Sequence, residues 1–158
     1  MVAYIVYNWS ENYGDANAQI KQSFITAYES IKSDRKVLLL GLIQSLFEGS
    51  MYVFVLEWTP ALTIDKNSSN PSIPHGYIFA AYMVAVMIGS NSFKFLIKNQ
   101  SVEKFMRIIL FLSALTLAVP VIFPKNQFLI FIAFIIFEMC VGIFWPSMGT
   151  LRSQLVPG

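Results

Sequence analysis

The sequence predicts an all-α polytopic membrane protein, in which four transmembrane helices follow one amphipathic surface helix. Of its 158 residues, 56% are hydrophobic and 13% are charged, whereas soluble domains carry about 25% charged residues. The mean hydropathy of the chain is +0.59. Four long apolar blocks reach the roughly 20 residues that a helix needs to cross a bilayer. The lipid bilayer is therefore the expected surroundings of most of the chain.

Two shorter stretches precede the first of these blocks. Residues 1–7 are apolar but far too short to cross a membrane, and we interpret them as the end of a truncated transmembrane helix. Residues 8–35 are polar, and their apolar side chains recur at near-helical spacing, namely Ile20, Phe24, Tyr28 and Ile31. This pattern is typical of a surface helix with one apolar stripe.

The four spans fill most of residues 36–158. We expect them at about residues 37–58, 76–97, 105–123 and 128–151. The first should stop at Thr59-Pro60, because proline disfavours continuation of a helix. The fourth contains Pro146, which allows the helix to bend. Together the spans predict a four-helix membrane bundle.

Basic residues set the expected orientation, because Lys and Arg in short connections concentrate on the cytoplasmic side. Nine of the eleven basic residues fall on one side of the predicted spans, and only Lys66 and Lys125 fall on the other. Residues 8–35, the connection near 98–104 and the C-terminus are therefore expected in the cytoplasm. On the opposite side, Asn67 begins an Asn-X-Ser pattern and is a candidate glycosylation site.

Polar side chains on the first span mark a candidate transport path. At 100° per residue, one helix face carries Gln44, Ser45, Glu48 and Tyr52. A charge at the bilayer centre costs on the order of 2.5–3.5 kcal/mol, so Glu48 is expected to face a polar cavity or a partner. It can bind a cation or a solute donor, or take up a proton; alternatively, it makes a structural hydrogen bond between helices. Glu57 lies near the outer end, where it can reach water.

The fourth span carries a second candidate stripe. Spacings of four, three and four place on one face Glu138, Gly142, Trp145 and Gly149. The stripe can border a central cavity, but small residues also let two helices approach closely. On the second span, spacing by four favours a packing face made of Ala81, Ala85 and Gly89.

Other functional classes find little support. The formal net charge of +2 is too small to indicate nucleic-acid binding. No phosphate loop, nucleophile motif or histidine-centred catalytic set occurs in the sequence, so an enzyme is disfavoured and no cofactor is expected. The single histidine, His75, has no cysteine or carboxylate at metal-ligand spacing, which argues against a metal site. The single cysteine, Cys140, is expected to be a packed thiol.

One run of the chain resembles a known family. Residues 33–60, with Ile-Gln-Ser-Leu-Phe-Glu at 43–48, resemble the start of the C-terminal half of molybdate-anion transporters, a branch of the major facilitator superfamily. Residues 8–13 resemble the end of the sixth helix of these carriers, and Phe-Trp-Pro-Ser-Met at 144–148 resembles the end of the tenth. The resemblance implies helices seven to ten of a twelve-helix carrier in the plasma membrane, with molybdate as the substrate and the missing helices as partners.

Two hypotheses for the function follow. In the first, these residues are part of a secondary transporter that moves an oxyanion such as molybdate by alternating access. Because facilitators bind substrate between two helix bundles, four spans should not transport alone. In the second, the chain is a stand-alone four-span scaffold or assembly protein, in which Glu48 and Glu138 serve helix association. Further spans encoded beside this reading frame would support the carrier.

Overall fold

The computed structural model describes residues 24–25, 28–29, 32, 34–63 and 74–155. The chain divides into two compact units, Met1–Leu38 and Leu39–Gly158. Three sequence predictions lie wholly or mostly outside the described residues: the apolar stub at 1–7, the surface helix within 8–35, and the glycosylation site at Asn67.

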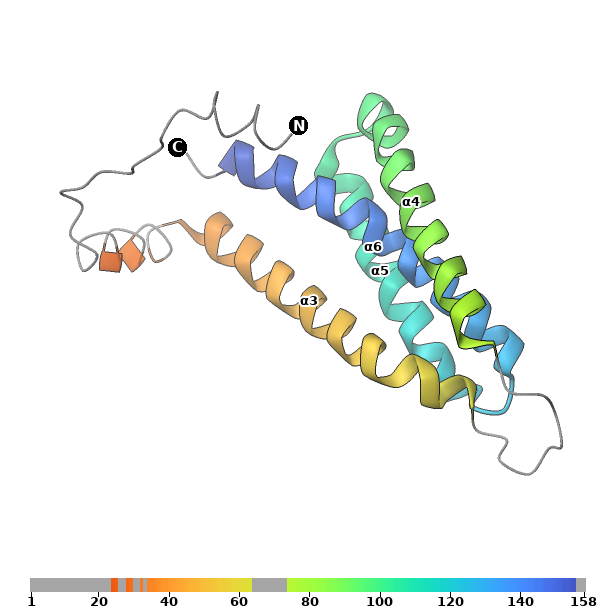
Figure 1. The fold of residues 1–158 in the computed structure, drawn as a ribbon. Coiled ribbons are helices and arrows are strands. Elements are labelled where there is room, and N and C mark those ends of the chain that lie inside the picture. The colour runs from red at the N-terminus through yellow and green to blue at the C-terminus, as the bar shows by residue number, and fades with distance from the viewer. Residues whose placement is uncertain (1–23, 26–27, 30–31, 33, 64–73, 156–158) are drawn as a thin grey trace, which may run out of the picture. The chain divides into compact units, whose positions relative to one another are not determined.

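Four helices make up the described part of the chain, and it contains no strand. They are α3 (Arg35–Leu62), α4 (His75–Asn99), α5 (Val102–Ile122) and α6 (Gln127–Leu155) (Figure 1). Each of the four is long and apolar enough to cross a membrane. The all-α fold with four membrane spans, predicted from the sequence, is thus confirmed.

Side-chain caps explain where two of the helices begin. The Asp34 carboxylate accepts a hydrogen bond of 2.8 Å from the backbone N–H of Lys36, before the first turn of α3. The Asn126 side-chain oxygen accepts one of 3.1 Å from the backbone N–H of Leu129 at the start of α6. Both caps satisfy backbone donors that have no partner inside the helix.

The end of α3 differs from the sequence prediction. We expected the helix to stop at Thr59-Pro60, but it continues to Leu62 with Pro60 inside it. Proline removes one backbone donor, and close to the end of a helix that loss disrupts little of the remaining hydrogen bonding. The carbonyl of Pro60 still accepts a bond of 3.0 Å from the N–H of Thr63.

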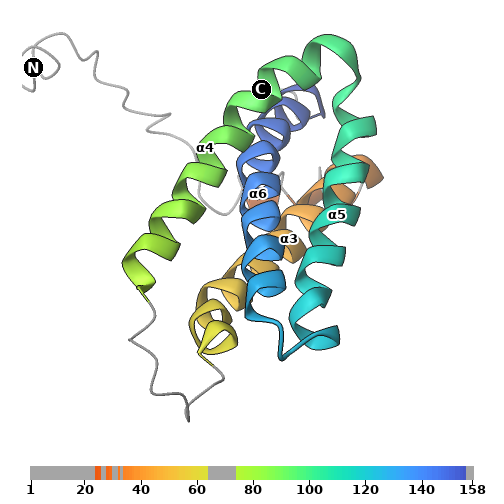
Figure 2. The same cartoon turned by 90° about the vertical axis from the view of Figure 1, so that its right-hand side faces the viewer.

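Helix α6 is the centre of the second unit. In Figure 2 it lies between α4 and α5. Its most deeply buried side chains, with no exposed surface, are Ile130, Phe137, Phe144 and Ser147. The other three helices are mostly exposed over their spanning segments, as expected for helices that face lipid or further protein.

Helices α4 and α6 approach each other backbone to backbone. A Cβ atom on Gly142 would collide with the carbonyl oxygen of Val86 and lie 2.9 Å from the backbone nitrogen of Ser90. A Cβ on Gly89 would collide with the carbonyl group of Met139. Ala85 is also buried, so the packing face predicted on this span is confirmed at Ala85 and Gly89. Such contacts between small residues hold membrane helices together, because apolar side chains gain little by leaving lipid.

Helix α3 packs on α6 through aromatic rings instead. The rings of Phe47 and Phe144 stack with centroids 3.8 Å apart, and those of Phe54 and Phe134 meet edge to face at 5.0 Å. Near the C-terminal end of α3, the Trp58 ring lies 5.6 Å from that of Tyr82. Large side chains at this interface keep the two backbones further apart than glycines would.

Hydroxyl groups inside the helices bond to their own backbone. Ser113 donates to the carbonyl of Ile109 at 2.8 Å, and Ser147 donates to that of Ile143 at 2.6 Å. After Pro146, Thr150 donates to the proline carbonyl at 2.9 Å. Within lipid these bonds satisfy hydroxyl groups that water cannot reach.

Candidate functional site

Three polar side chains from two helices form one hydrogen-bonded network. A guanidinium nitrogen of Arg152, in the last turn of α6, donates to the side-chain oxygen of Gln44 at 2.6 Å. The side-chain nitrogen of Gln44 donates to a carboxylate oxygen of Glu48 at 2.7 Å. We call Gln44, Glu48 and Arg152 the polar network. It links residues 108 positions apart in the sequence.

The chemistry of the three groups fixes the direction of these bonds. A guanidinium only donates and an ionised carboxylate only accepts, so the amide of Gln44 must point its oxygen at Arg152 and its nitrogen at Glu48. Gln44 lies nine residues beyond Arg35, which is roughly 14 Å along the helix. The network therefore extends from one end of α6 well into the membrane-spanning part of α3.

The other candidates that the sequence suggests on α3, and Trp145 on α6, do not join the network. The Ser45 hydroxyl donates to the carbonyl of Gly41 at 2.9 Å rather than towards Glu48. Tyr52 is 71% exposed, and none of α4, α5 and α6 covers it. Trp145 on α6 is 43% exposed, and its ring meets that of Phe144 edge to face at 5.9 Å.

Arg152 is the functional candidate that sequence reasoning missed. In the sequence it was one of the nine basic residues that set the orientation, and it follows the segment that resembles the end of the tenth helix. The signal that marks it is its isolation, because it is the only lysine or arginine in the 29 residues of α6. A lone cation on such an apolar helix needs either water or a polar partner, and here Gln44 is that partner.

The stripe predicted on α6 splits into residues with different surroundings. Glu138 is buried, with 8% of its surface exposed, and no hydrogen bond to its side chain is found within the described helices. Gly142 lies against the backbone of α4, so it lets two helices approach closely and does not border a cavity. Gly149 has nothing within 4 Å of the position that its Cβ would take. The stripe is thus not a continuous cavity wall.

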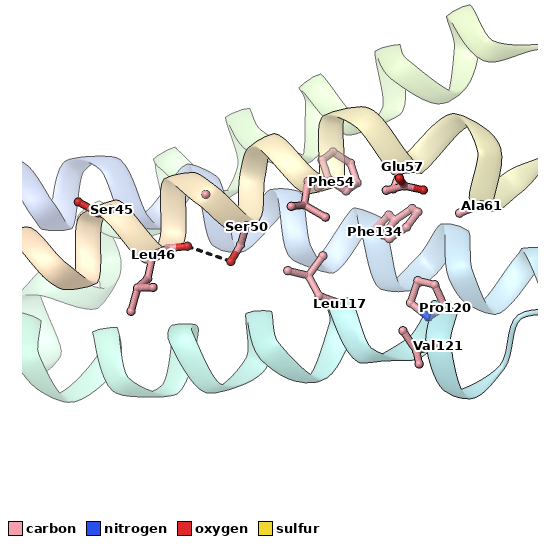
Figure 3. Close-up of a pocket in the computed structure, with 12 residues that line it drawn as sticks. Ser45, Leu46, Ser50, Phe54, Glu57, Ala61, Leu117, Pro120, Val121 and Phe134 are labelled. Carbon is pink, nitrogen blue, oxygen red and sulfur yellow. Dashed lines mark hydrogen bonds between the residues drawn. The ribbon is translucent and has the colours of Figure 1, made fainter.

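A cavity of about 680 Å³ lies between α3, α5 and α6 (Figure 3). Most of its wall is apolar; the polar side chains in it are Ser45, Ser50 and Glu57. The hydroxyl of Ser50 is engaged with the carbonyl of Leu46 at 3.0 Å. Glu57 is exposed on the described helices. The residues that line the cavity include neither Gln44 nor Glu48.

The cavity and the polar network therefore lie on different sides of α3. At 100° per residue, Ser50 and Glu57 point roughly opposite to Glu48 around the helix. Phe47 and Phe54 form the packed contact of α3 with α6, and Gln44 and Glu48 lie half-buried beside it.

No metal site emerges among the described residues, where no three histidine, cysteine or carboxylate groups come together. His75 opens α4, and its ring lies 5.8 Å from the ring of Trp58. Cys140 is 2% exposed, which confirms the packed thiol predicted from the sequence.

These features define a class of protein: an integral membrane protein built from apolar helices, with a charged and hydrogen-bonded network that joins two of them. Intramembrane ionisable groups of this kind are typical of proteins that move solutes or protons. Comparison with known proteins agrees with that class. A family model described as sugar transporters with twelve transmembrane segments matches residues 1–139. The chain belongs to this family of the major facilitator superfamily.

The curated relatives carry a more specific name. The chain is 30% identical to a molybdate-anion transporter of Xenopus tropicalis over 99% of its length, and 29% identical to that of Xenopus laevis over 99%. It is 30% identical to the molybdate-anion transporter of Danio rerio over 90%. The alignments cover 34%, 35% and 30% of these relatives, so the chain spans about a third of their length. No solved structure matches the chain.

Proposed function

We propose that this chain is part of a secondary transporter that moves an oxyanion, molybdate, across a membrane by alternating access. The polar network is the observation that carries the proposal, because it bonds an amide and a carboxylate of the spanning helix α3 to a cation in the last turn of α6. The names of the curated relatives support molybdate as the substrate. The partners are the lipid bilayer and the remaining helices of the carrier, since a facilitator works by rocking two bundles around one site.

Glu48 is the proposed proton acceptor or gate residue of this carrier. A carboxylate repels an oxyanion, so it is poorly suited as a direct ligand. Glu48 is half-buried and bonds only to Gln44 among the described residues, so helices outside the described part of the chain can also reach it. The amide of Gln44 donates a hydrogen bond of 2.7 Å to Glu48 and accepts one from Arg152, so it links the two charged groups.

Glu48→Gln is expected to abolish the dependence of molybdate uptake on external pH. Cells expressing the complete carrier should take up molybdate several-fold faster at acidic than at neutral external pH, because inward proton movement drives uptake. Glutamine stays neutral throughout this range, so the variant should show one rate at both pH values. Initial uptake rates at matched surface expression measure this.

Glu57→Gln is the matched control, because Glu57 lies on the same helix but on the side of the cavity. It should keep the pH dependence of the wild type. A Glu48→Gln carrier that retained the full pH dependence would remove the proposed role of Glu48 in coupling.

The proposed location is the plasma membrane, with residues 8–35 and the C-terminus in the cytoplasm. This orientation predicts one N-linked glycan, at Asn67. Asn67→Gln should abolish the shift in gel mobility that N-glycosidase treatment causes. Asn8 and Asn99, which also begin Asn-X-Ser patterns, should carry none. A glycan on Asn99, at the end of α4, would reverse the proposed orientation.

A further inference from the structure

Arg152 holds a guanidinium group whose bonding capacity is mostly unused in the described helices. An arginine has five N–H donors in a planar fork. Its hydrogen bond to Gln44 uses one of them, and Arg152 forms no ion pair with any described carboxylate. Its side chain is exposed rather than packed inside the unit.

We propose that Arg152 contacts the transported oxyanion directly, and that Gln44 positions its guanidinium for that contact. The inference rests on the proposed function and names a residue for it. A planar guanidinium offers two parallel donors to two oxygens of a tetrahedral dianion such as molybdate. Because one edge of the group is fixed by Gln44, the remaining donors are presented in a defined direction.

The amide between the two charges matters for this role. Had Glu48 bonded Arg152 directly, the carboxylate would neutralise the guanidinium, and an incoming anion would have to displace it. Gln44 separates the two groups while bonding to both. Gln44 therefore occupies one donor of the guanidinium, and the others stay available for a ligand.

The competing account is that Arg152 only clamps α6 to α3. Polar bonds between membrane helices do hold them together. The two accounts differ in what a substitution changes. Loss of a clamp lowers the amount of folded carrier and its maximal rate, whereas loss of an anion contact raises KM for molybdate.

Uptake kinetics of the complete carrier separate these accounts. KM and maximal rate for labelled molybdate are measured for the wild type and for Arg152→Gln, Arg152→Lys and Arg107→Gln. Arg152→Gln should raise KM about tenfold or more, because a hydrogen-bonded charge contact to the anion is lost. Arg152→Lys should raise it several-fold, because an ammonium group keeps the charge without the two-donor fork.

Arg107 is the matched control. It is an exposed arginine near the start of α5, and its Nε atom bonds only within its own helix, to the carbonyl of Glu103 at 3.4 Å. Its replacement by glutamine should leave KM unchanged.

Each result counts for or against the inference. A higher KM in both Arg152 variants, with the wild-type KM in Arg107→Gln, supports the anion contact. If Arg152→Gln does not reach the membrane, the KM of Arg152→Lys decides. A KM within twofold of the wild type in either Arg152 variant overturns it and leaves the clamp. If the wild-type carrier takes up no molybdate, the proposed function is refuted. This result comes from the wild type alone and does not depend on the variants.

Discussion

Replacing Gly142 with valine is expected to separate α4 from α6 and to destabilise the bundle strongly. The added Cβ would collide with the backbone of Val86 and Ser90. Backbone atoms in a helix cannot swing aside as the end of a side chain can, so the helices must move apart. A cost of about 3 kcal/mol is expected, at the upper end of the usual range for overpacking.

Thermal unfolding of the chain in detergent measures this effect. The Gly142→Val variant should lose helical structure at a clearly lower temperature than the wild type. Gly149→Ala on the same helix is the control, because open space surrounds that position. Alanine favours helix over glycine by about 0.8–1 kcal/mol, so this control should unfold at the same temperature or slightly higher. Equal unfolding temperatures for Gly142→Val and the wild type would contradict the close approach of α4 and α6.

Phe144→Ala is expected to release α3 from α6. The Phe144 side chain has no exposed surface, and its ring stacks on that of Phe47 at a centroid distance of 3.8 Å. Truncation leaves a cavity where α3 now packs. Loss of a buried phenylalanine costs about 3–5 kcal/mol in soluble proteins, and we expect the lower end here because lipid or detergent also shelters apolar groups.

The effect should be local, which makes it measurable. Cysteines placed on α3 and α6 for crosslinking should react with each other less in Phe144→Ala than in the parent protein. Phe128→Ala on the same helix is the control, since Phe128 is 74% exposed and its removal opens no cavity. The same loss of crosslinking in both variants would mean that general weakening of α6, rather than the Phe47–Phe144 stack, explains the result.

The spans were predictable because their signal is local. A block of about 20 apolar residues is sufficient to indicate a transmembrane helix, and all four such blocks are helices in the structure. Helix ends were predicted less well. Pro60 indicates a stop in isolation, but α3 continues for two more residues, since a proline near a helix end disrupts little hydrogen bonding.

The site was predictable only where it lies within one helix. The spacing of four between Gln44 and Glu48 places them on one face, and the structure shows them hydrogen-bonded. The partner of Gln44 on α6 was not predictable, because the contact with Arg152 depends on how α3 and α6 cross. The cavity beside Glu57 was missed for the same reason, as three helices form its wall.

Reconstitution tests the central claim most directly. The complete carrier that contains these residues is purified, inserted into liposomes and supplied with labelled molybdate and an inward proton gradient. We predict accumulation of molybdate well above that in empty liposomes, and its loss when the gradient is collapsed. Correctly inserted protein that leaves the molybdate content equal to that of empty liposomes would contradict the account and favour a four-span scaffold.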